Sequence, residues 1–529
     1  MVKRSNSKLV NKDSFYVAGL FIAAIALYTS GLNNLPLRDW DEAIVAGVAR
    51  DIWRSTGDNL TWLYPTINNG QPYWNKPPLV HWLIAASYSL FGVSEWSARI
   101  FPALLSSSCV PLVYKIGTEL FTSRLNAVFS ALVYLAFLPI ARHGRLAMLD
   151  GAINCWFCLA VWCLLRGRKD RRWLLGTGLG IGLICLTKGI MLGVLLGGII
   201  IVFLLWDSPK ILFSPYLASS AILGIIPIIF WYRMQYLHYG AEFLGTSLGE
   251  QTFNRIWQPI SSIDSPPWYY LLEIAKYGLP WLIFLPQGIR LAIKTRHQSW
   301  AKLALVWCGM YLLAVSLMVT KLPWYIMPVY PGLSLLIGAS LGIAWKNKIY
   351  PHSWKISLAA VTAICWLGSI YFALVSSSDR GLFLIVGIVA IAFTIATILL
   401  WRASRYFILA TVGGFYLGLL LLFNSPYWLW ELNEAFPVLP TASIIEKNTP
   451  PQTSIYTAYP HSRPSLEFYS ERLFVPTTDE ELTRLWQQEK SVYLLLDRDA
   501  IMRLNLENVS VLGVQDQNYE WQLITNKNQ

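Results

Sequence analysis

Long apolar runs recur along most of the chain and constrain its fold more than any other feature. The apolar core of a bilayer is roughly 30 Å thick, and an α-helix needs about 20 apolar residues to cross it. Thirteen candidate spans lie near residues 14–31, 97–118, 125–140, 149–166, 173–187, 189–206, 211–231, 278–294, 302–319, 323–344, 356–376, 381–400 and 405–424. The sequence therefore predicts an all-α polytopic membrane protein with about 13 transmembrane helices.

Composition supports this class and excludes others. The chain is 55% hydrophobic and only 14% charged, whereas a soluble domain carries about 25% charged residues. This deficit excludes a disordered chain and argues against an ordinary cytosolic enzyme. A net charge of +12 can indicate nucleic-acid binding. Here the cations form short clusters between apolar runs, so we expect membrane lipids as neighbours and no nucleic acid.

The cationic clusters also predict the orientation. Lys3, Arg4, Lys8 and Lys12 precede the first span, and no small-residue cleavage site follows it, so we expect an uncleaved anchor. The short apolar run Leu79–Phe91 decides the rest. If this run does not cross, the Arg166–Arg172 cluster and the other strongly cationic loops all fall inside, as the positive-inside rule requires.

We therefore expect Leu79–Phe91 to form a helix along the outer face of the inner (plasma) membrane. The segments 32–96, 232–277 and 425–529 then face the periplasm or exterior. Residues 1–424 are predicted to form a transmembrane domain that includes the first two of these segments.

The tail 425–529 alternates short apolar runs, Ser454–Tyr456, Ser491–Leu496 and Val509–Val514, with a polar helical stretch, Thr478–Gln488. This pattern predicts a small outward-facing α/β domain.

A glycine run, Gly176-Thr177-Gly178-Leu179-Gly180-Ile181-Gly182, superficially resembles a nucleotide-binding loop. It follows no strand and lies in an apolar span. Close helix packing is the better interpretation.

Three carboxylates stand together after the first span, in Arg38-Asp39-Trp40-Asp41-Glu42. One interpretation is a solvated loop in which Asp39 or Asp41 caps a following helix, Glu42–Ser55. The other is a general base or metal ligand at the bilayer surface. The residues alone leave both open.

Further along the same loop, glycine and proline hold Tyr73 and Lys76 just before Leu79–Phe91. An aromatic ring and an ammonium at headgroup depth suit a lipid phosphate. A snorkelling lysine and an interfacial aromatic are the structural alternative.

Other outward ends carry polar residues. Arg145 and Asp150 lie in one predicted turn, either as a structural pair or as functional groups at the mouth of a span. Arg255 could bind a phosphate through its guanidinium fork. Lys321 and Tyr325 are one helical turn apart and share a face. Lys188 is another outward-end cation, and snorkelling would explain both lysines.

In this order, the motifs resemble those of the GT-C class of integral-membrane glycosyltransferases. The bacterial branch with lipid A aminoarabinose transferases and relatives of protein O-mannosyltransferases is the most similar. The resemblance covers the whole chain. It rests on Asp41-Glu42, Gly70 to Pro78, Phe91-Gly92 to Ala98-Arg99, Arg145 to Asp150, Leu186 to Gly189, Asn254-Arg255, Pro267 to Tyr270 and Lys321 to Pro328.

The resemblance implies a GT-C fold and an inverting enzyme. A polyprenyl-phosphate-linked sugar would be the donor, and a lipid, glycan or protein hydroxyl at the outer face the acceptor. Lipid A modification is one such reaction. Asp41 would be the prime catalytic candidate, as general base, with Glu42 and Asp150 as further catalytic residues.

The same resemblance implies the donor site. Lys76 and Tyr73 would hold the donor phosphate with help from Arg255, and Lys321 and Tyr325 would line the same cavity with Asp150.

Two positions differ from the aminoarabinose branch: Asn75 stands where an acidic residue is common, and Ile44 where arginine is common. The resemblance therefore specifies neither a hexosyl nor a pentosyl group, and it implies no certain cofactor. A divalent metal is left open.

The alternative function is a polytopic transporter or flippase of a lipid-linked substrate. Such a protein should carry ionisable residues near the bilayer midplane and broken helices in matching halves. Here the polar residues gather at outward ends and loops, which favours the enzyme.

Overall fold

The computed structural model describes residues 2–55, 60–68, 70–258, 265–375, 380–428, 438–458, 463–488, 491–515 and 521–526. The chain forms two compact units. Met1–Asn34, Trp74–Leu83 and Arg99–Trp428 make up the first, which we call the helical unit. Leu35–Tyr73, Ile84–Ala98 and Leu429–Gln529 make up the second, which we call the mixed unit.

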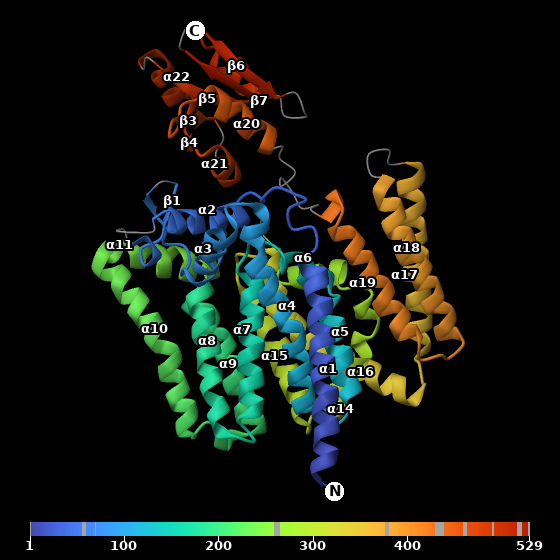
Figure 1. Ribbon diagram of the computed structural model, residues 1–529. Coiled ribbons are helices and arrows are strands. Elements are labelled where there is room, and N and C mark those ends of the chain that lie inside the picture. The colour runs from blue at the N-terminus through green and yellow to red at the C-terminus, as the bar shows by residue number, and fades with distance from the viewer. Residues whose placement is uncertain are drawn as a thin grey trace. The chain divides into compact units, whose positions relative to one another are not determined.

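Each of the thirteen predicted spans contains a helix (Figure 1). These are α1 (Val2–Tyr28), α4 (Glu95–Leu120), α5 (Arg124–Leu135), α7 (Asp150–Arg166), α8 (Leu175–Lys188), α9 (Ile190–Asp207), α10 (Pro215–Tyr239), α14 (Leu285–Lys294), α15 (Ser299–Leu317), α16 (Tyr330–Asn347), α17 (His352–Leu374), α18 (Arg380–Trp401) and α19 (Phe407–Phe423). Short helices α6 (Leu138–His143), α11 (Ala241–Leu244), α12 (Arg255–Trp257) and α13 (Tyr269–Tyr277) connect them. Within the described residues, seven helices are long and apolar enough to cross a membrane.

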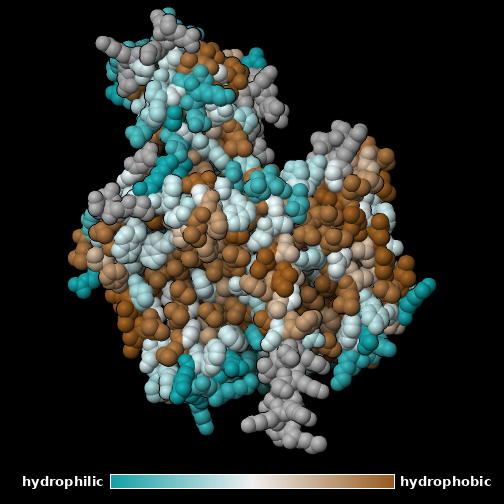
Figure 2. Space-filling model, in the orientation of Figure 1, coloured by the Kyte–Doolittle hydropathy of each residue, from teal (hydrophilic) through white to brown (hydrophobic). Residues whose placement is uncertain are grey.

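Apolar side chains cover the flank of the helical unit that Figure 2 shows. On α10, Ile222, Ile226 and Ile229 are all exposed. In contrast, 94% of the most apolar window within Pro323–Asn347 is buried. A buried central helix with exposed apolar outer helices is the arrangement of a protein surrounded by lipid. The chain is a multi-pass membrane protein, as predicted.

Two predicted spans are not continuous helices. The span 125–140 breaks after α5, because Pro139 stands in the first turn of α6 and has no amide to continue the preceding helix. The span 278–294 is α-helical only from Leu285, after Pro280 and a 3-10 turn, Trp281–Ile283. The ten residues of α14 rise only about 15 Å.

Glycines bring α8 and α10 into close contact (Figure 1). A Cβ atom at Gly178 would lie 1.9 Å from the Ser220 carbonyl oxygen, and one at Gly182 would lie 2.6 Å from the Gly224 carbonyl oxygen. Neither Gly178 nor Gly182 of α8 can therefore be replaced by a residue with a Cβ atom unless the helices move. The interpretation of the glycine run as a helix-packing surface is confirmed.

The C-terminal part of the mixed unit is a small α/β domain, as predicted. Its sheet has the order β4-β3-β5-β7-β6. The strands are β3 (Ser454–Thr457), β4 (Leu473–Pro476), β5 (Tyr493–Leu496), β6 (Ser510–Gln515) and β7 (Trp521–Thr525). β3 pairs in parallel with β4 and β5, and β7 pairs antiparallel with β5 and β6.

Helices cover both faces of this sheet, because side chains alternate along each strand. Leu495 of β5 packs with α20 (Val438–Asn448) and α21 (Pro464–Ser470). Leu494 and Leu496 pack on the other face with α22 (Asp479–Gln488) and α23 (Arg498–Leu504).

The mixed unit also contains much of the first loop, and this differs from the predicted division at residue 424. α2 (Asp41–Arg54) packs against α21 of the α/β domain. The short strands β1 (Thr66–Ile67) and β2 (Gln71–Pro72) form a hairpin beside it. The helix expected at Leu79–Phe91 is α3, with the same bounds.

The glycine contacts make a testable prediction about stability. Gly178→Ala should lower the unfolding free energy by about 1–3 kcal/mol, because the added methyl group forces α8 and α10 apart. Gly198→Ala in α9 is the matched control, since a Cβ there meets nothing within 4 Å. Thermal unfolding in detergent would measure both. Equal midpoints for the two variants would contradict the packing account.

Candidate donor-phosphate site

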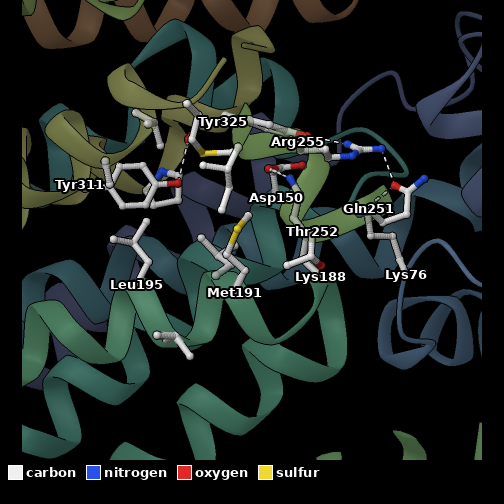
Figure 3. A pocket seen from close by; sticks show the side chains of 17 residues that line it. Lys76, Asp150, Lys188, Met191, Leu195, Gln251, Thr252, Arg255, Tyr311 and Tyr325 are labelled. Carbon is white, nitrogen blue, oxygen red and sulfur yellow. Dashed lines mark hydrogen bonds and ion pairs between the residues drawn. The ribbon is translucent and has the colours of Figure 1, made fainter. Parts of the chain in front are cut away.

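A cavity of about 380 Å³ lies within the helical unit (Figure 3). Charged and polar side chains form one part of the cavity wall, and apolar side chains form the rest. The polar lining residues are Lys76, Asp150, Lys188, Gln251, Thr252, Arg255, Tyr311 and Tyr325. Three cations thus face one carboxylate among the described lining residues.

Asp150 and Lys188 form an ion pair at the cavity. Asp150 begins α7 and is 4% exposed. Lys188 ends α8, and its Nζ lies 2.6 Å from Asp150 Oδ1. A carboxylate at a helix N-terminus and an ammonium at a C-terminus both complement the helix dipoles. The Lys188 Nζ also lies 4.8 Å from the centre of the Tyr325 ring, which suits a cation–π contact.

The alternative pairing of Asp150 with Arg145 is wrong. Arg145 donates to the Ser30 carbonyl oxygen, and its guanidinium carbon lies 4.3 Å from the Phe423 ring centre. Its contacts are those of a buried structural cation.

Arg255 lies next to the same cavity with neutral partners. It follows a π-helical segment, Gly245–Asn254, and begins α12. Its Nη1 donates to Tyr325 Oη at 2.7 Å, and its Nη2 donates to Gln251 Oε1. Lys76 Nζ lies 3.5 Å from the same Gln251 oxygen. Gln251 therefore links two cations from distant parts of the chain.

The backbone of Tyr325 is held by a hydrogen bond from Tyr311. Tyr325 lies in a 3-10 helix, Pro323–Val329, and its carbonyl oxygen accepts a 2.8 Å hydrogen bond from Tyr311 Oη. Tyr311 is buried in α15. These contacts fix the segment that carries the Tyr325 phenol at the cavity.

The remaining walls are apolar. α9 contributes Met191, Leu192, Val194 and Leu195. α15 contributes Ala314 and Val315, and Met318 directly follows it. Figure 3 shows Met191 and Leu195 pointing toward the cavity from α9. A site with cations at one part and aliphatic walls at another fits an amphiphilic anion.

The structure brings Lys76, Asp150, Arg255 and Tyr325 to one cavity. Lys321 is not among the described lining residues, and its Nζ donates to the Met318 carbonyl oxygen at 2.5 Å.

Sequence reasoning missed Gln251 and Tyr311. Gln251 precedes Arg255 by four residues, the separation of neighbours on a helix face. That spacing was a usable signal, whereas nothing local marked Tyr311.

Asp41, Glu42 and Tyr73 belong to the mixed unit. Asp41 is the first residue of α2, and neither Asp39 nor Asp41 caps the helix, whose N-cap is Trp40 without a side-chain hydrogen bond. The capping interpretation is therefore wrong. Glu42 is fully buried and accepts a 3.0 Å hydrogen bond from the Arg38 amide. Tyr73 is 5% exposed and anchors its amide on the Pro65 carbonyl oxygen.

One carboxyl group of the mixed unit, that of Glu467, has a shifted pKa. The pKa of Glu467 is raised from its ordinary 4.5 to about 7, chiefly by burial and to a smaller extent by the nearby Asp39 charge. Hydrogen bonds from the Phe474 amide and Asn68 Nδ2, and the Arg50 charge, act in the opposite direction. Among the residues that the structure describes, no three His, Cys, Asp or Glu side chains gather closely enough to hold a metal ion.

Comparison with known proteins shows what the chain is similar to. A family model described as dolichyl-phosphate-mannose-protein mannosyltransferase matches residues 75–232. The undecaprenyl phosphate-alpha-4-amino-4-deoxy-L-arabinose arabinosyl transferase 2 of Pseudomonas fluorescens Pf0-1 is 28% identical over 332 residues, which are 61% of this chain and 58% of that protein. The corresponding transferase of Erwinia tasmaniensis is 29% identical, over 60% of this chain and 58% of that protein.

A solved structure extends the likeness to nearly the whole chain. ArnT from Cupriavidus metallidurans, bound to undecaprenyl phosphate, aligns with a TM-score of 0.80 and 19% identity over 96% of this chain and 98% of that chain. The chain has the fold of a GT-C integral-membrane glycosyltransferase. Its predicted resemblance to the bacterial lipid A aminoarabinose transferases is confirmed.

The Glu467 environment makes a pH prediction. Between its ordinary value of 4.5 and about 7, the folded carboxyl keeps a proton that the unfolded chain releases. The unfolding free energy should therefore fall by roughly 2–3 kcal/mol as pH rises through this window.

Glu467→Gln should flatten this dependence, while the exposed Glu480→Gln control should keep it. The unfolding midpoint of the full chain in detergent at pH 5 and pH 8 measures the slope. Identical slopes for wild type and Glu467→Gln would reject the account.

Proposed function

We propose that this chain is an inverting glycosyltransferase that moves a sugar from a polyprenyl-phosphate carrier to a lipid acceptor. The reaction takes place at the outer face of the cytoplasmic membrane, where nucleotide sugars are absent and a lipid carrier must supply the sugar. The similarity to undecaprenyl phosphate-aminoarabinose arabinosyl transferases supports the donor class. The positive-inside pattern supports the orientation.

The observation that carries the proposal is the charge balance of the cavity. Lys188 is already neutralised by Asp150. Arg255 has only a phenol and an amide as side-chain partners among the described residues. Its full positive charge is available to an anion beside aliphatic walls, and Lys76 lines the same cavity. A polyprenyl phosphate combines such an anion with an apolar chain.

The chemistry explains why cations belong there. The bond between the anomeric carbon and the phosphate oxygen breaks, and its electron pair leaves with the carrier phosphate. Negative charge on the phosphate therefore grows in the transition state, where Arg255 and Lys76 stabilise it. Tyr325 donates a hydrogen bond to the same group. Gln251 Oε1 accepts hydrogen bonds from both cations and so holds them near each other.

The acceptor oxygen attacks the anomeric carbon from the face opposite the phosphate, which inverts its configuration. Asp41 takes the acceptor proton as general base. This role rests on the position of Asp41 in the Asp-Glu motif. Glu42 fixes the turn before it through the Arg38 amide. We assign Tyr73 and Lys321 to donor binding on the same motif grounds.

Arg255→Ala tests the donor site. Losing hydrogen bonds from a charged group costs about 1.5–3 kcal/mol, so kcat/KM for the polyprenyl-phosphate-linked sugar should fall roughly tenfold to hundredfold. Steady-state transfer with varied donor measures this.

Lys169→Ala is the matched control, since this lysine pairs with Glu119, which keeps Arg166 as a partner. Wild-type donor dependence in Arg255→Ala would reject the phosphate site.

A further inference from the structure

Asp39 is held by the N-terminal residues of α21, although it lies 426 positions from Ser465 in the sequence. Its Oδ1 accepts hydrogen bonds from the Ser465 amide at 3.0 Å and the Ser465 hydroxyl at 2.6 Å. Its Oδ2 accepts one from Arg463 Nη1 at 3.0 Å. The Asp39 side chain is 2% exposed. We call this set of contacts the Asp39 clamp.

The clamp adjoins a strained turn. Trp40 has φ 64° and ψ −88°, a left-handed backbone that residues with a Cβ atom rarely adopt. Such conformations persist only where surrounding contacts impose them, and they cluster at functional sites. The Trp40 side chain is 42% exposed, so burial of the indole does not explain the strain. The residue lies between the fixed Asp39 on one side and the start of α2 on the other.

A second set of contacts fixes the far end of α2 on the same helix α21. Arg50 Nη1 donates to the Phe468 carbonyl oxygen at 2.5 Å, and its guanidinium carbon lies 4.6 Å from the Phe468 ring centre. Arg54 pairs with Glu471. Because Arg50 and Arg54 still hold the far end of α2 when the clamp is released, the loss changes the turn before Asp41 more than it changes the position of the helix.

We propose that Asp39 is a positioning residue, and that the α/β domain uses the Asp39 clamp to hold the Trp40 turn so that Asp41 points toward its substrate. Asp39 is not itself the base, because its side chain is only 2% exposed and three donors of the α/β domain hold it. The inference rests on the proposed role of Asp41. It adds that the α/β domain is part of the catalytic machinery.

The test compares Asp39→Ala with Asp39→Asn in the full chain. A misplacement of about 1 Å can lower the rate about 100-fold, so Asp39→Ala should lower kcat by about that factor. The KM for the polyprenyl-phosphate-linked sugar should stay within about twofold, because the cavity is unchanged. Asp39→Asn should recover at least about tenfold of the lost kcat, since its amide oxygen can accept both Ser465 bonds.

Two further variants keep the test decisive. Ser465→Ala removes the 2.6 Å bond alone and should lower kcat severalfold even if Asp39→Ala fails to fold. Asp479→Asn breaks the exposed Asp479–Arg503 pair of the same domain and should leave kcat unchanged.

Wild-type kcat in Asp39→Ala or Ser465→Ala, a loss through KM alone, or an equal loss in Asp39→Asn would overturn the inference. Asp41→Asn separates this failure from a failure of the proposed function. If Asp41→Asn is inactive while Asp39→Ala is fully active, the clamp is wrong and the base assignment stands. If Asp41→Asn retains full turnover, the base assignment itself fails, and the clamp has no catalytic role.

Discussion

The ion pair between Asp150 and Lys188 joins the start of α7 to the end of α8 inside the helical unit. A buried carboxylate without a partner would cost several kcal/mol, so Asp150 needs Lys188. Once this pair is formed, the two helix ends are fixed and Lys188 lies against Tyr325. The Tyr325 hydroxyl in turn accepts a hydrogen bond from Arg255. The Asp150–Lys188 pair, in which the two charges neutralise each other, therefore helps to place Arg255, whose charge remains for a ligand.

The mixed unit uses the same principle for a different purpose. Asp39 is also a nearly buried carboxylate, and its donors come from α21. Satisfying this charge fixes the strained Trp40 turn before Asp41. In each unit a structural ion pair supports a neighbouring group that we assign to the reaction. The scarcity of acidic residues in the chain, 30 Asp and Glu among 529 residues, makes each buried one informative.

Local patterns predicted the elements well. Helix α3 has the predicted bounds because Leu79–Phe91 is a continuous apolar run between turn residues. Strands β4 and β7 were not predicted, because each is only four or five residues long and gives a weak local pattern. Lys76, Arg255 and Tyr325 were each singled out by residue type and position. That they line one cavity could be seen only in the folded structure, because residues such as Lys76 and Gln251 are 175 positions apart in the sequence.

The side chains that pair with the candidate residues were harder to predict than the candidate residues themselves. The sequence offered Arg145 as the neighbour of Asp150, because the two are close in the chain, whereas the fold supplies Lys188 from the next helix. The Asp39 clamp had no local signal at all. The departures at Ile44 and Asn75 still leave the sugar unspecified, and neither residue is among the described residues that line the cavity.

Donor consumption by the purified chain in detergent micelles tests the central claim most directly, because micelles have no two leaflets between which a lipid could be moved. With a polyprenyl-phosphate-linked sugar and a lipid acceptor, mass spectrometry should detect free polyprenyl phosphate and glycosylated acceptor in equal amounts. Asp41→Asn should produce neither. A donor that binds but stays intact with the wild-type chain would contradict the transferase and favour a transporter.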